Sequence, residues 1–465
     1  MRTVTETADA VRRGELKAVE VLDECLAAIE SRNGPLNAFV HLDADLARTA
    51  ADAVDEAVAR GDDPGPLAGV PFGVKDLEDC AGMPTSHGSL LYKGRPPVNE
   101  DSVHVGRLRA AGAVPVGKTA APEFGTVAFT HTKAWGTTRN PWNPELTPGG
   151  SSGGSAASVA AGLVPFCTAS DGGGSTRTPA AFSGLVGLKA SYGRIPNPGA
   201  ATSQTTALGA LTTTVADTAR HLDVVAGPDD RDRLSLPPSG VVYERAIEEL
   251  DVTGLRAVWS SDLGFAAVDT EVRELTESAA VALIEGAGLE RVDRPIVLTD
   301  PVRTWLSAGA VDMWLNLEDD MWPERAGELM GFVRKPYEQT EAYPVRKYAR
   351  SYKWRHRLEE EVAAVFADVD VLLTPMTAVP AYGAAGPMPT VIDGRDVGPA
   401  MAVPFAMLAN LCWNPAISLP AGLNSAGLPV GVQVIGRRHA DEVVLRLARL
   451  YEQARPWPRF AKAYS

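Results

Sequence analysis

The stretch Gly149-Gly150-Ser151-Ser152-Gly153-Gly154-Ser155 opens the part of the sequence that decides the fold. A second glycine run, Asp171-Gly172-Gly173-Gly174-Ser175-Thr176-Arg177, follows it after the mainly apolar residues 156–169. Glycines inside a folded core mark positive φ or a close approach of the backbone to another group. Because alanine, valine and leucine are interleaved with these runs, the region is typical of a packed core and not of a linker.

Short apolar runs suited to buried strands alternate with amphipathic helical stretches around these segments. The strand candidates are 70–74, 113–116, 163–168, 255–259, 369–373, 416–419 and 430–435. The helix candidates are 19–29, 43–60, 103–111, 215–225, 271–285, 345–366 and 441–453. This alternation predicts the α/β class: a single large domain with a mixed, largely parallel β-sheet covered by helices on both faces.

The first sixty residues are expected to be mainly helical. Val19, Leu22, Leu26 and Ile29 recur at three- and four-residue steps, and Gly34-Pro35 predicts the end of that helix. We therefore predict that residues 1–65 form an N-terminal helical arm packing on the core and that residues 66–465 form the main domain.

The composition is that of a globular protein, with 45% hydrophobic and 22% charged residues. Lys plus Arg is 44 and Asp plus Glu is 58, so the net charge is −14, which argues against direct binding of nucleic acid or an anionic membrane. The sequence contains no apolar run of about 18 residues, so no membrane helix is predicted. The N-terminus does not resemble a signal peptide. The scattered cysteines, Cys25, Cys80, Cys167 and Cys412, predict free thiols and a cytoplasmic protein.

The glycine runs and one lysine together supply the parts that acyl transfer needs. Ser175 offers a hydroxyl, and the glycines before it leave the N–H groups of Gly172, Gly173, Gly174 and Ser175 free to converge on a developing oxyanion. Lys75, at the end of an apolar strand, is the candidate base if burial keeps its amine neutral. Taken alone, such a lysine would more often extend to solvent, and such a glycine loop could be an anion nest.

The sequence resembles the amidase signature family of serine hydrolases along nearly its whole length. The resemblance is densest in a signature segment of about 117–190. The matching motifs include Gly117-Lys118-Thr119, Trp135-Gly136-Thr137-Thr138-Arg139-Asn140-Pro141-Trp142, Asn414-Pro415-Ala416-Ile417-Ser418-Leu419-Pro420 and Gly431-Val432-Gln433.

The resemblance implies a Ser-cisSer-Lys triad. By motif, Ser175 matches the nucleophile, Ser151 the bridging serine after a cis peptide (Gly150–Ser151), and Lys75 the general base. Ser152, Asp171 and Arg177 match positions that support this geometry. Gly172 departs from the usual Thr or Ile, which adds backbone entropy beside the expected oxyanion hole.

The implied function is an amidase that hydrolyses the C–N bond of a small linear or cyclic carboxamide, with no metal or organic cofactor. The alternative is an amidotransferase A-type subunit that releases ammonia within a tRNA-dependent complex. A Ser-His-Asp hydrolase and a metal site are disfavoured, because no G-x-S-x-G elbow follows a predicted strand and no H-E-x-x-H motif is present. The predicted partner is a small amide, with a homodimer left open.

Aromatic and methionine residues gather in the variable, substrate-facing region of about 295–345. They are Trp305, Met313, Trp314, Met321, Trp322, Met330 and Phe332. Two interpretations stay open for this group: helical core, or an apolar wall over the acyl pocket.

Overall fold

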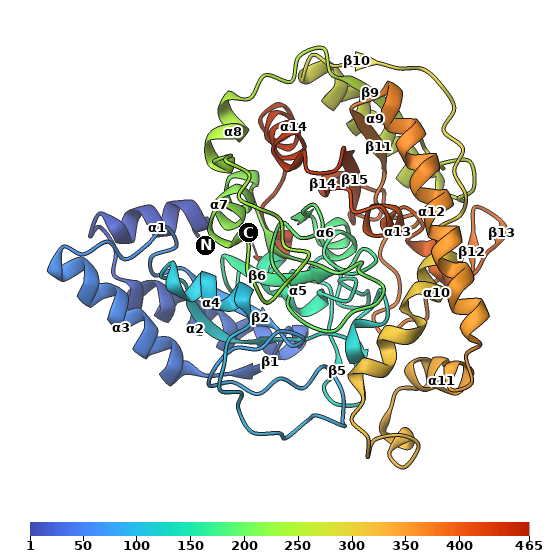
Figure 1. Ribbon diagram of the computed structural model, residues 1–465. Coiled ribbons are helices and arrows are strands. Elements are labelled where there is room, and N and C mark those ends of the chain that lie inside the picture. Colours follow the sequence, from blue (N-terminus) through green and yellow to red (C-terminus); the bar gives the residue numbers. More distant parts are fainter. Residues whose placement is uncertain (465) are drawn as a thin grey trace.

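The computed structural model describes residues 1–464, in which an 11-stranded sheet runs through the molecule (Figure 1). In spatial order its strands are β1 (Phe39–Leu42), β3 (Val114–Thr119), β2 (Pro71–Lys75), β6 (Phe166–Asp171), β8 (Ala207–Thr212), β7 (Val186–Lys189), β14 (Ala416–Leu423), β15 (Pro429–Gly436), β11 (Val371–Pro375), β9 (Arg256–Trp259) and β10 (Glu290–Arg291). Two small hairpins pair β4 (His131–Thr132) with β5 (Gly136–Thr137) and β12 (Val391–Ile392) with β13 (Arg395–Asp396).

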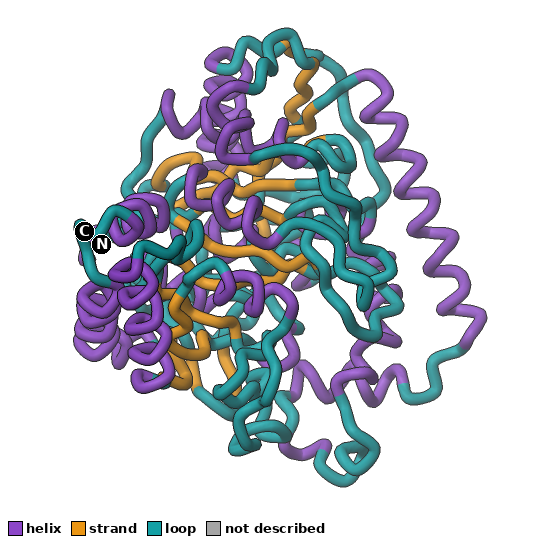
Figure 2. The backbone as a smooth tube through the Cα atoms, turned by 60° about the vertical axis from the view of Figure 1, so that its left-hand side comes forward, coloured by secondary structure: helices purple, strands orange, loops and turns teal. Residues whose placement is uncertain are grey.

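Helices surround the sheet (Figure 2). They are α1 (Val4–Arg12), α2 (Ala18–Leu36), α3 (Ala44–Arg60), α4 (Val103–Ala110), α5 (Gly153–Ala160), α6 (Arg177–Ser183), α7 (Val215–Val225), α8 (Tyr243–Glu249), α9 (Thr270–Gly286), α10 (Val302–Asp312), α11 (Gly331–Thr340), α12 (Val345–Asp368), α13 (Ala406–Leu411) and α14 (Asp441–Ala454). The predicted α/β class, with a mixed sheet between helices, is confirmed.

Parallel pairing is confined to two blocks of the sheet, whereas the sequence predicted a largely parallel sheet. Strands β3, β2 and β6 run parallel to their neighbours within the first block, as do β11, β9 and β10 within the second. Between these blocks every pairing is antiparallel. The sequence missed the short strands β7 and β8, and the tight turn between β14 and β15 can join only antiparallel neighbours.

Helix ends follow from local sequence, with one exception. The Asp43 side chain accepts a hydrogen bond from Leu46 N at the start of α3, and Gly61 ends that helix in a left-handed conformation. By contrast α2 does not end at Gly34-Pro35: it continues to Leu36 and ends at Asn37, whose φ is 51°. The Asn33 side chain accepts hydrogen bonds from the amides of residues 38 and 39, which ties the chain just beyond the helix to its last turn.

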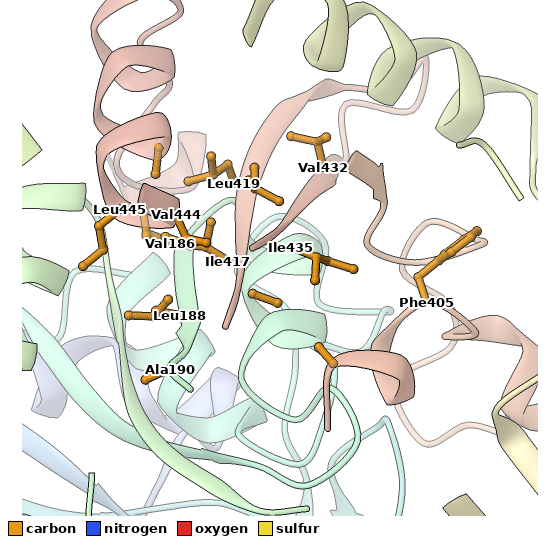
Figure 3. Close-up of a cluster of buried hydrophobic side chains, with 14 of the residues drawn as sticks. Val186, Leu188, Ala190, Phe405, Ile417, Leu419, Val432, Ile435, Val444 and Leu445 are labelled. Atoms are coloured by element: carbon orange, nitrogen blue, oxygen red, sulfur yellow. The ribbon is translucent and has the colours of Figure 1, made fainter. Parts of the chain in front are cut away.

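The two faces of the sheet carry different helices. On β15, a Cβ at Gly431 would meet Ala181 of α6, whereas a Cβ at Gly436 would meet Val444 of α14, so these helices cover opposite faces. Side chains of β7, β14, β15 and α14 share one buried apolar core. These side chains include Val186, Leu188, Ile417, Leu419, Val432, Ile435, Val444 and Leu445 (Figure 3).

The N-terminal residues contribute a strand as well as helices. Strand β1, which follows α2 and precedes α3 along the chain, pairs antiparallel with β3 at one edge of the sheet. Apolar residues of these two helices share a second buried cluster with β3 and α5. Among residues 1–464, no helix is long and apolar enough to cross a membrane.

Candidate active site

Lys75 lies at the carboxyl end of β2, beside the end of the parallel strand β6. Its side chain is fully buried, and its Nζ donates a hydrogen bond to Ser151 Oγ at 2.8 Å. Nζ also donates to Ser170 Oγ at 2.9 Å, and the Lys75 backbone N–H donates to Thr168 Oγ1 at 2.9 Å. Ligand sites of α/β proteins commonly lie in this position, outside the carboxyl ends of parallel strands.

Burial is the largest influence on the Lys75 amine. It lowers the pKa of Lys75 from 10.5 to about 7, while the carboxylates of Glu78 and then Asp171 act in the opposite direction. A neutral form of the amine is therefore accessible near neutral pH. The sequence analysis required a buried amine if Lys75 is to be the base, and the structure shows this burial.

Ser151 is placed by the glycines that precede it. The Gly150–Ser151 peptide is cis, as the resemblance implied, and α5 begins two residues later. Gly149 has a φ of 93°, and a Cβ there would lie 2.9 Å from Pro179 Cα. A Cβ at Gly150 would lie 2.5 Å from Val127 O. Only glycine fits at either position, which is why the two precede the serine.

Ser175 lies just before α6, next to the Ser151 segment. Ser152 N donates a hydrogen bond to Ser175 O at 3.1 Å, which joins the two serine-bearing segments. Ser175 is half-buried, and its hydroxyl makes no hydrogen bond with other residues of the described chain. The structure thus joins Lys75 to Ser151 by a side-chain hydrogen bond and joins the Ser175 segment to theirs through the backbone.

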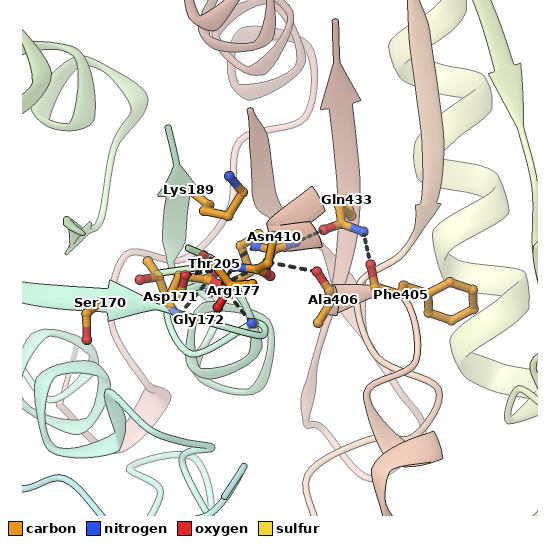
Figure 4. A network of polar contacts seen from close by, with 12 residues as sticks. Ser170, Asp171, Gly172, Arg177, Lys189, Thr205, Phe405, Ala406, Asn410 and Gln433 are labelled. Atoms are coloured by element: carbon orange, nitrogen blue, oxygen red, sulfur yellow. Dashed lines mark hydrogen bonds and ion pairs between the residues drawn. The ribbon is translucent and has the colours of Figure 1, made fainter. Parts of the chain in front are cut away.

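Asp171 and Arg177 form a fully buried ion pair beneath this loop (Figure 4). Arg177 Nε and Nη2 each donate to the Asp171 carboxylate at 2.9 Å. Arg177 also donates to Asn410 Oδ1 at 2.7 Å and to Gln433 Oε1 at 2.5 Å. Burial favours the neutral acid, but the Arg177 charge and these hydrogen bonds outweigh it and hold the pKa of Asp171 well below its usual range.

The predicted set of oxyanion donors needs one correction. Gly174 N already donates a hydrogen bond to Asp171 Oδ1 at 2.7 Å, so this amide is not available to a substrate oxygen. The N–H groups of Gly172, Gly173 and Ser175 make no hydrogen bond with other residues in the described part of the chain. The error arose because the glycine run looks uniform in sequence, whereas the buried carboxylate selects one of its amides.

Trp305 of α10 lies directly on the glycine loop. Its Nε1 donates a hydrogen bond to Gly172 O at 2.6 Å, and a Cβ on Gly173 would lie 2.7 Å from its indole ring. The indole therefore packs where the glycine lacks a side chain. The flexibility expected from glycine at position 172 is restrained by this contact.

The rest of the aromatic and methionine group gathers in a second cluster, although Phe332, like Trp305, also packs against the main core. Met313, Trp314, Met321, Trp322, Met330 and Phe332 belong to a small apolar cluster around Leu91, Leu329, Val333 and Tyr337. Of these six only Met321 is buried and the other five are half-buried, so both interpretations stay open for them. Much of their segment is turn and 3-10 helix and not one continuous helix.

Three contributors to the site were not identified from the sequence. Ser170 contacts the Lys75 amine, and Asn410 and Gln433 bind Arg177. Ser170 immediately precedes the Asp171 motif, and Gln433 closes the Gly431-Val432-Gln433 motif, so both had a sequence signal. Asn410 had none, because its position is set by packing of α13 against the loop.

Comparison with known proteins places the chain in a family. The family model described as Amidase matches residues 20–445. The chain belongs to the amidase family. This amidase is 35% identical to the A-type subunit of the glutamyl-tRNA(Gln) amidotransferase of Chloroflexus aurantiacus, over 98% of the chain and 97% of that protein. It is 33% identical to an acylamidase of Rhodococcus erythropolis, over 98% of the chain and 96% of that protein.

Solved structures agree with this assignment. The amidase superposes on a bacterial aryl acylamidase of the amidase signature family with a TM-score of 0.91 and 29% identity, covering 98% of this chain and 96% of the other. The resemblance stated from the sequence is confirmed. The protein is a hydrolase that acts on amides.

Proposed function

We propose that this amidase cleaves the C–N bond of a small carboxamide through a seryl acyl-enzyme. Ser175 Oγ attacks the carbonyl carbon, and its proton passes through Ser151 Oγ to the neutral amine of Lys75. Lys75 returns the proton through the same hydroxyl to the leaving nitrogen as the C–N bond breaks. Water then attacks the ester, with Lys75 again as the base, and the acid and free Ser175 are released.

The proposal rests chiefly on one observation. A fully buried lysine amine, with its pKa lowered to about 7, donates a hydrogen bond to the Ser151 hydroxyl at 2.8 Å. A base with a pKa near the working pH combines a large neutral fraction with a useful driving force for proton transfer. The N–H groups of Gly172, Gly173 and Ser175 supply the donors that would stabilise the oxyanion.

A substrate screen with a nucleophile variant tests the proposal. The purified chain should release ammonia or amine from at least one member of a panel of aliphatic, aromatic and cyclic amides. Ser175→Ala should abolish that release while the circular dichroism spectrum stays unchanged. Turnover that persists in a folded Ser175→Ala protein would assign the nucleophile elsewhere.

A second candidate function is supported by the likeness to the amidotransferase chain of Chloroflexus aurantiacus. In that case the protein would release ammonia for companion chains that act on misacylated tRNA. Hydrolysis of simple amides by the chain alone favours the stand-alone amidase. If glutamine is the only amide from which ammonia is released, and if this release requires companion chains, the result favours the amidotransferase. A homodimer stays a prediction in either case.

We also propose a reducing compartment, the cytoplasm. All four cysteines are free and buried, and the chain carries no disulfide to be maintained among its described residues. Cell fractionation, with the protein found in the cytoplasmic fraction, is the corresponding test.

A further inference from the structure

The loop before α6 contains three peptide groups whose N–H groups the proposed reaction uses to bind the oxyanion. These N–H groups belong to Gly172, Gly173 and Ser175, and they make no hydrogen bond with other residues of the described chain. All three peptides are trans. A trans peptide is planar, and its C=O and N–H point to opposite sides. A group that binds the carbonyl oxygen of such a peptide therefore also fixes the direction of its N–H.

Side chains from two helices bind the carbonyl oxygens of two of these peptides. Asn410 of α13 donates from Nδ2 to Asp171 O at 2.7 Å, on the peptide that carries the N–H of Gly172 (Figure 4). Trp305 of α10 donates from Nε1 to Gly172 O at 2.6 Å, on the peptide that carries the N–H of Gly173. Both distances are short for N–H···O hydrogen bonds, so each peptide is held firmly from its carbonyl side.

The backbone supports the third free donor, whereas the amide that is not free lacks such support. Thr178 N donates to Gly174 O at 2.7 Å, on the peptide that carries the N–H of Ser175. The remaining amide of the loop, Gly174 N, is the one that Asp171 already binds. The carbonyl oxygen of its peptide, Gly173 O, accepts no hydrogen bond among residues 1–464. Within the described loop, a bound carbonyl oxygen thus coincides with a free N–H.

The peptide between Gly172 and Gly173 is also closely packed. A Cβ on Gly172 would lie 2.9 Å from Thr206 Oγ1, and a Cβ on Gly173 would lie 2.7 Å from the indole of Trp305. Two consecutive glycines would otherwise leave this peptide many orientations. The indole ring restricts that freedom, and its N–H selects the direction of the carbonyl.

A hydrogen bond to a carbonyl oxygen has a second effect on the same peptide. It draws electron density toward the oxygen, which makes the N–H of that peptide a stronger donor, so hydrogen bonds in series strengthen one another. The gain is larger when the N–H faces a full negative charge, as on the oxygen of a tetrahedral intermediate. The neutral carbonyl oxygen of the substrate gains less, so the effect falls mainly on the transition state.

We propose that Trp305 and Asn410 are positioning residues for the oxyanion: each binds the carbonyl oxygen of a loop peptide and thereby aims and strengthens the N–H on the other side of that peptide. Both act through the backbone and not by contact with the reacting atoms. This inference rests on the proposed attack by Ser175. Trp305 is the better residue to test, because Asn410 also contacts Asp171 Oδ1 and Arg177, so its replacement would disturb the buried ion pair.

The test replaces Trp305 by phenylalanine, which keeps a ring over Gly173 and removes the donor to Gly172 O. For Trp305→Phe and the wild type, kcat/KM is measured for the amide that the wild type cleaves best and for its thionoamide, in which sulfur replaces the carbonyl oxygen. Sulfur is a weak hydrogen-bond acceptor, so the thionoamide depends less on the N–H donors. We expect kcat/KM for the amide to fall roughly two- to tenfold, the range of one net hydrogen bond, and kcat/KM for the thionoamide to change less.

Trp457→Phe is the matched control, because Trp457 Nε1 also donates to a backbone carbonyl, Thr213 O, which lies outside the loop. Its kcat/KM should equal that of the wild type for both substrates. Trp305 is half-buried and phenylalanine retains a ring there, so Trp305→Phe should fold, which thermal unfolding checks. If the wild type does not cleave the thionoamide, inhibition constants replace the comparison. Trp305→Phe should then weaken inhibition by the aldehyde that forms a tetrahedral adduct with Ser175, and not inhibition by the corresponding primary alcohol.

Two results would overturn the inference and leave the mechanism intact. One is an unchanged kcat/KM for the amide in folded Trp305→Phe. The other is an equal loss for amide and thionoamide, or for aldehyde and alcohol, which a displaced Ser175 would cause. Amide turnover that persists in Ser175→Ala would instead refute the mechanism, and with it the role of the oxyanion donors.

Discussion

At the scale of single residues, the protonation of Lys75 governs the proposed chemistry. Burial lowers its pKa to about 7, so the amine is mostly neutral above this pH and mostly charged below it. We expect kcat/KM to rise with pH through this region and to fall about tenfold for each unit of pH on the acid side. Initial rates between pH 5 and 9 measure this, and a flat profile down to pH 5 would contradict a lysine base.

Ser151 can be tested with a serine from the helix that follows it as a control. Ser151→Ala breaks the hydroxyl path between Lys75 and Ser175 and should lower kcat on the order of 10²-fold or more. Ser158→Ala, in α5, loses a hydrogen bond to Gly154 O and an interaction with the Cys167 thiol, neither of which touches Lys75 or Ser175, and should keep its activity. Equal kcat values for the two variants would exclude Ser151 from the proton path.

The buried ion pair between Arg177 and Asp171 is expected to contribute to the stability of the fold. Arg177→Met leaves the Asp171 carboxylate buried without its partner, which should lower the free energy of unfolding by about 3–5 kcal/mol in urea denaturation. The exposed pair Arg245–Glu249 offers a matched control, because Arg245→Met should change stability little. Adding Asp171→Asn to Arg177→Met removes the second charge and should recover part of the loss. A buried pair that behaves like the exposed one would refute this account.

At the scale of elements, α10 acts on the loop that contains Ser175. Trp305→Phe keeps a ring over Gly173 but removes the hydrogen bond to Gly172 O. With the loop less restrained, kcat should fall roughly two- to tenfold, the range expected for one net hydrogen bond. Trp314→Phe loses a comparable hydrogen bond to Thr340 Oγ1 in a separate cluster and should leave kcat unchanged. Steady-state kinetics of both variants decide whether the contact matters.

At the scale of the whole molecule, we expect the N-terminal residues and the site to fold as one unit. Strand β1 covers the edge of β3, and α2 and α3 cover apolar residues of β3 and α5. Deleting residues 1–65 would expose this cluster and the β3 edge, so we expect the fragment 66–465 to aggregate. Removing only residues 1 and 2 should leave a soluble, active protein. A soluble fragment with a cooperative thermal transition would establish 66–465 as an independent domain.

Local patterns along the chain were enough to specify most elements and to predict the chemistry. Helix α7 was predicted with its observed bounds because apolar periodicity and capping are local properties. Lys75, Ser151 and Ser175 were named because their neighbours form recognisable motifs.

Folding in three dimensions settled the rest. Gly174 N is taken by Asp171, the centre of the sheet is antiparallel, and Trp305 covers a loop 133 residues away in the chain. Glu78, His104 and His221, three buried residues joined by hydrogen bonds in that order, likewise meet only in the folded protein. These features depend on which distant side chains share a buried space, and no pattern along the chain carries that information.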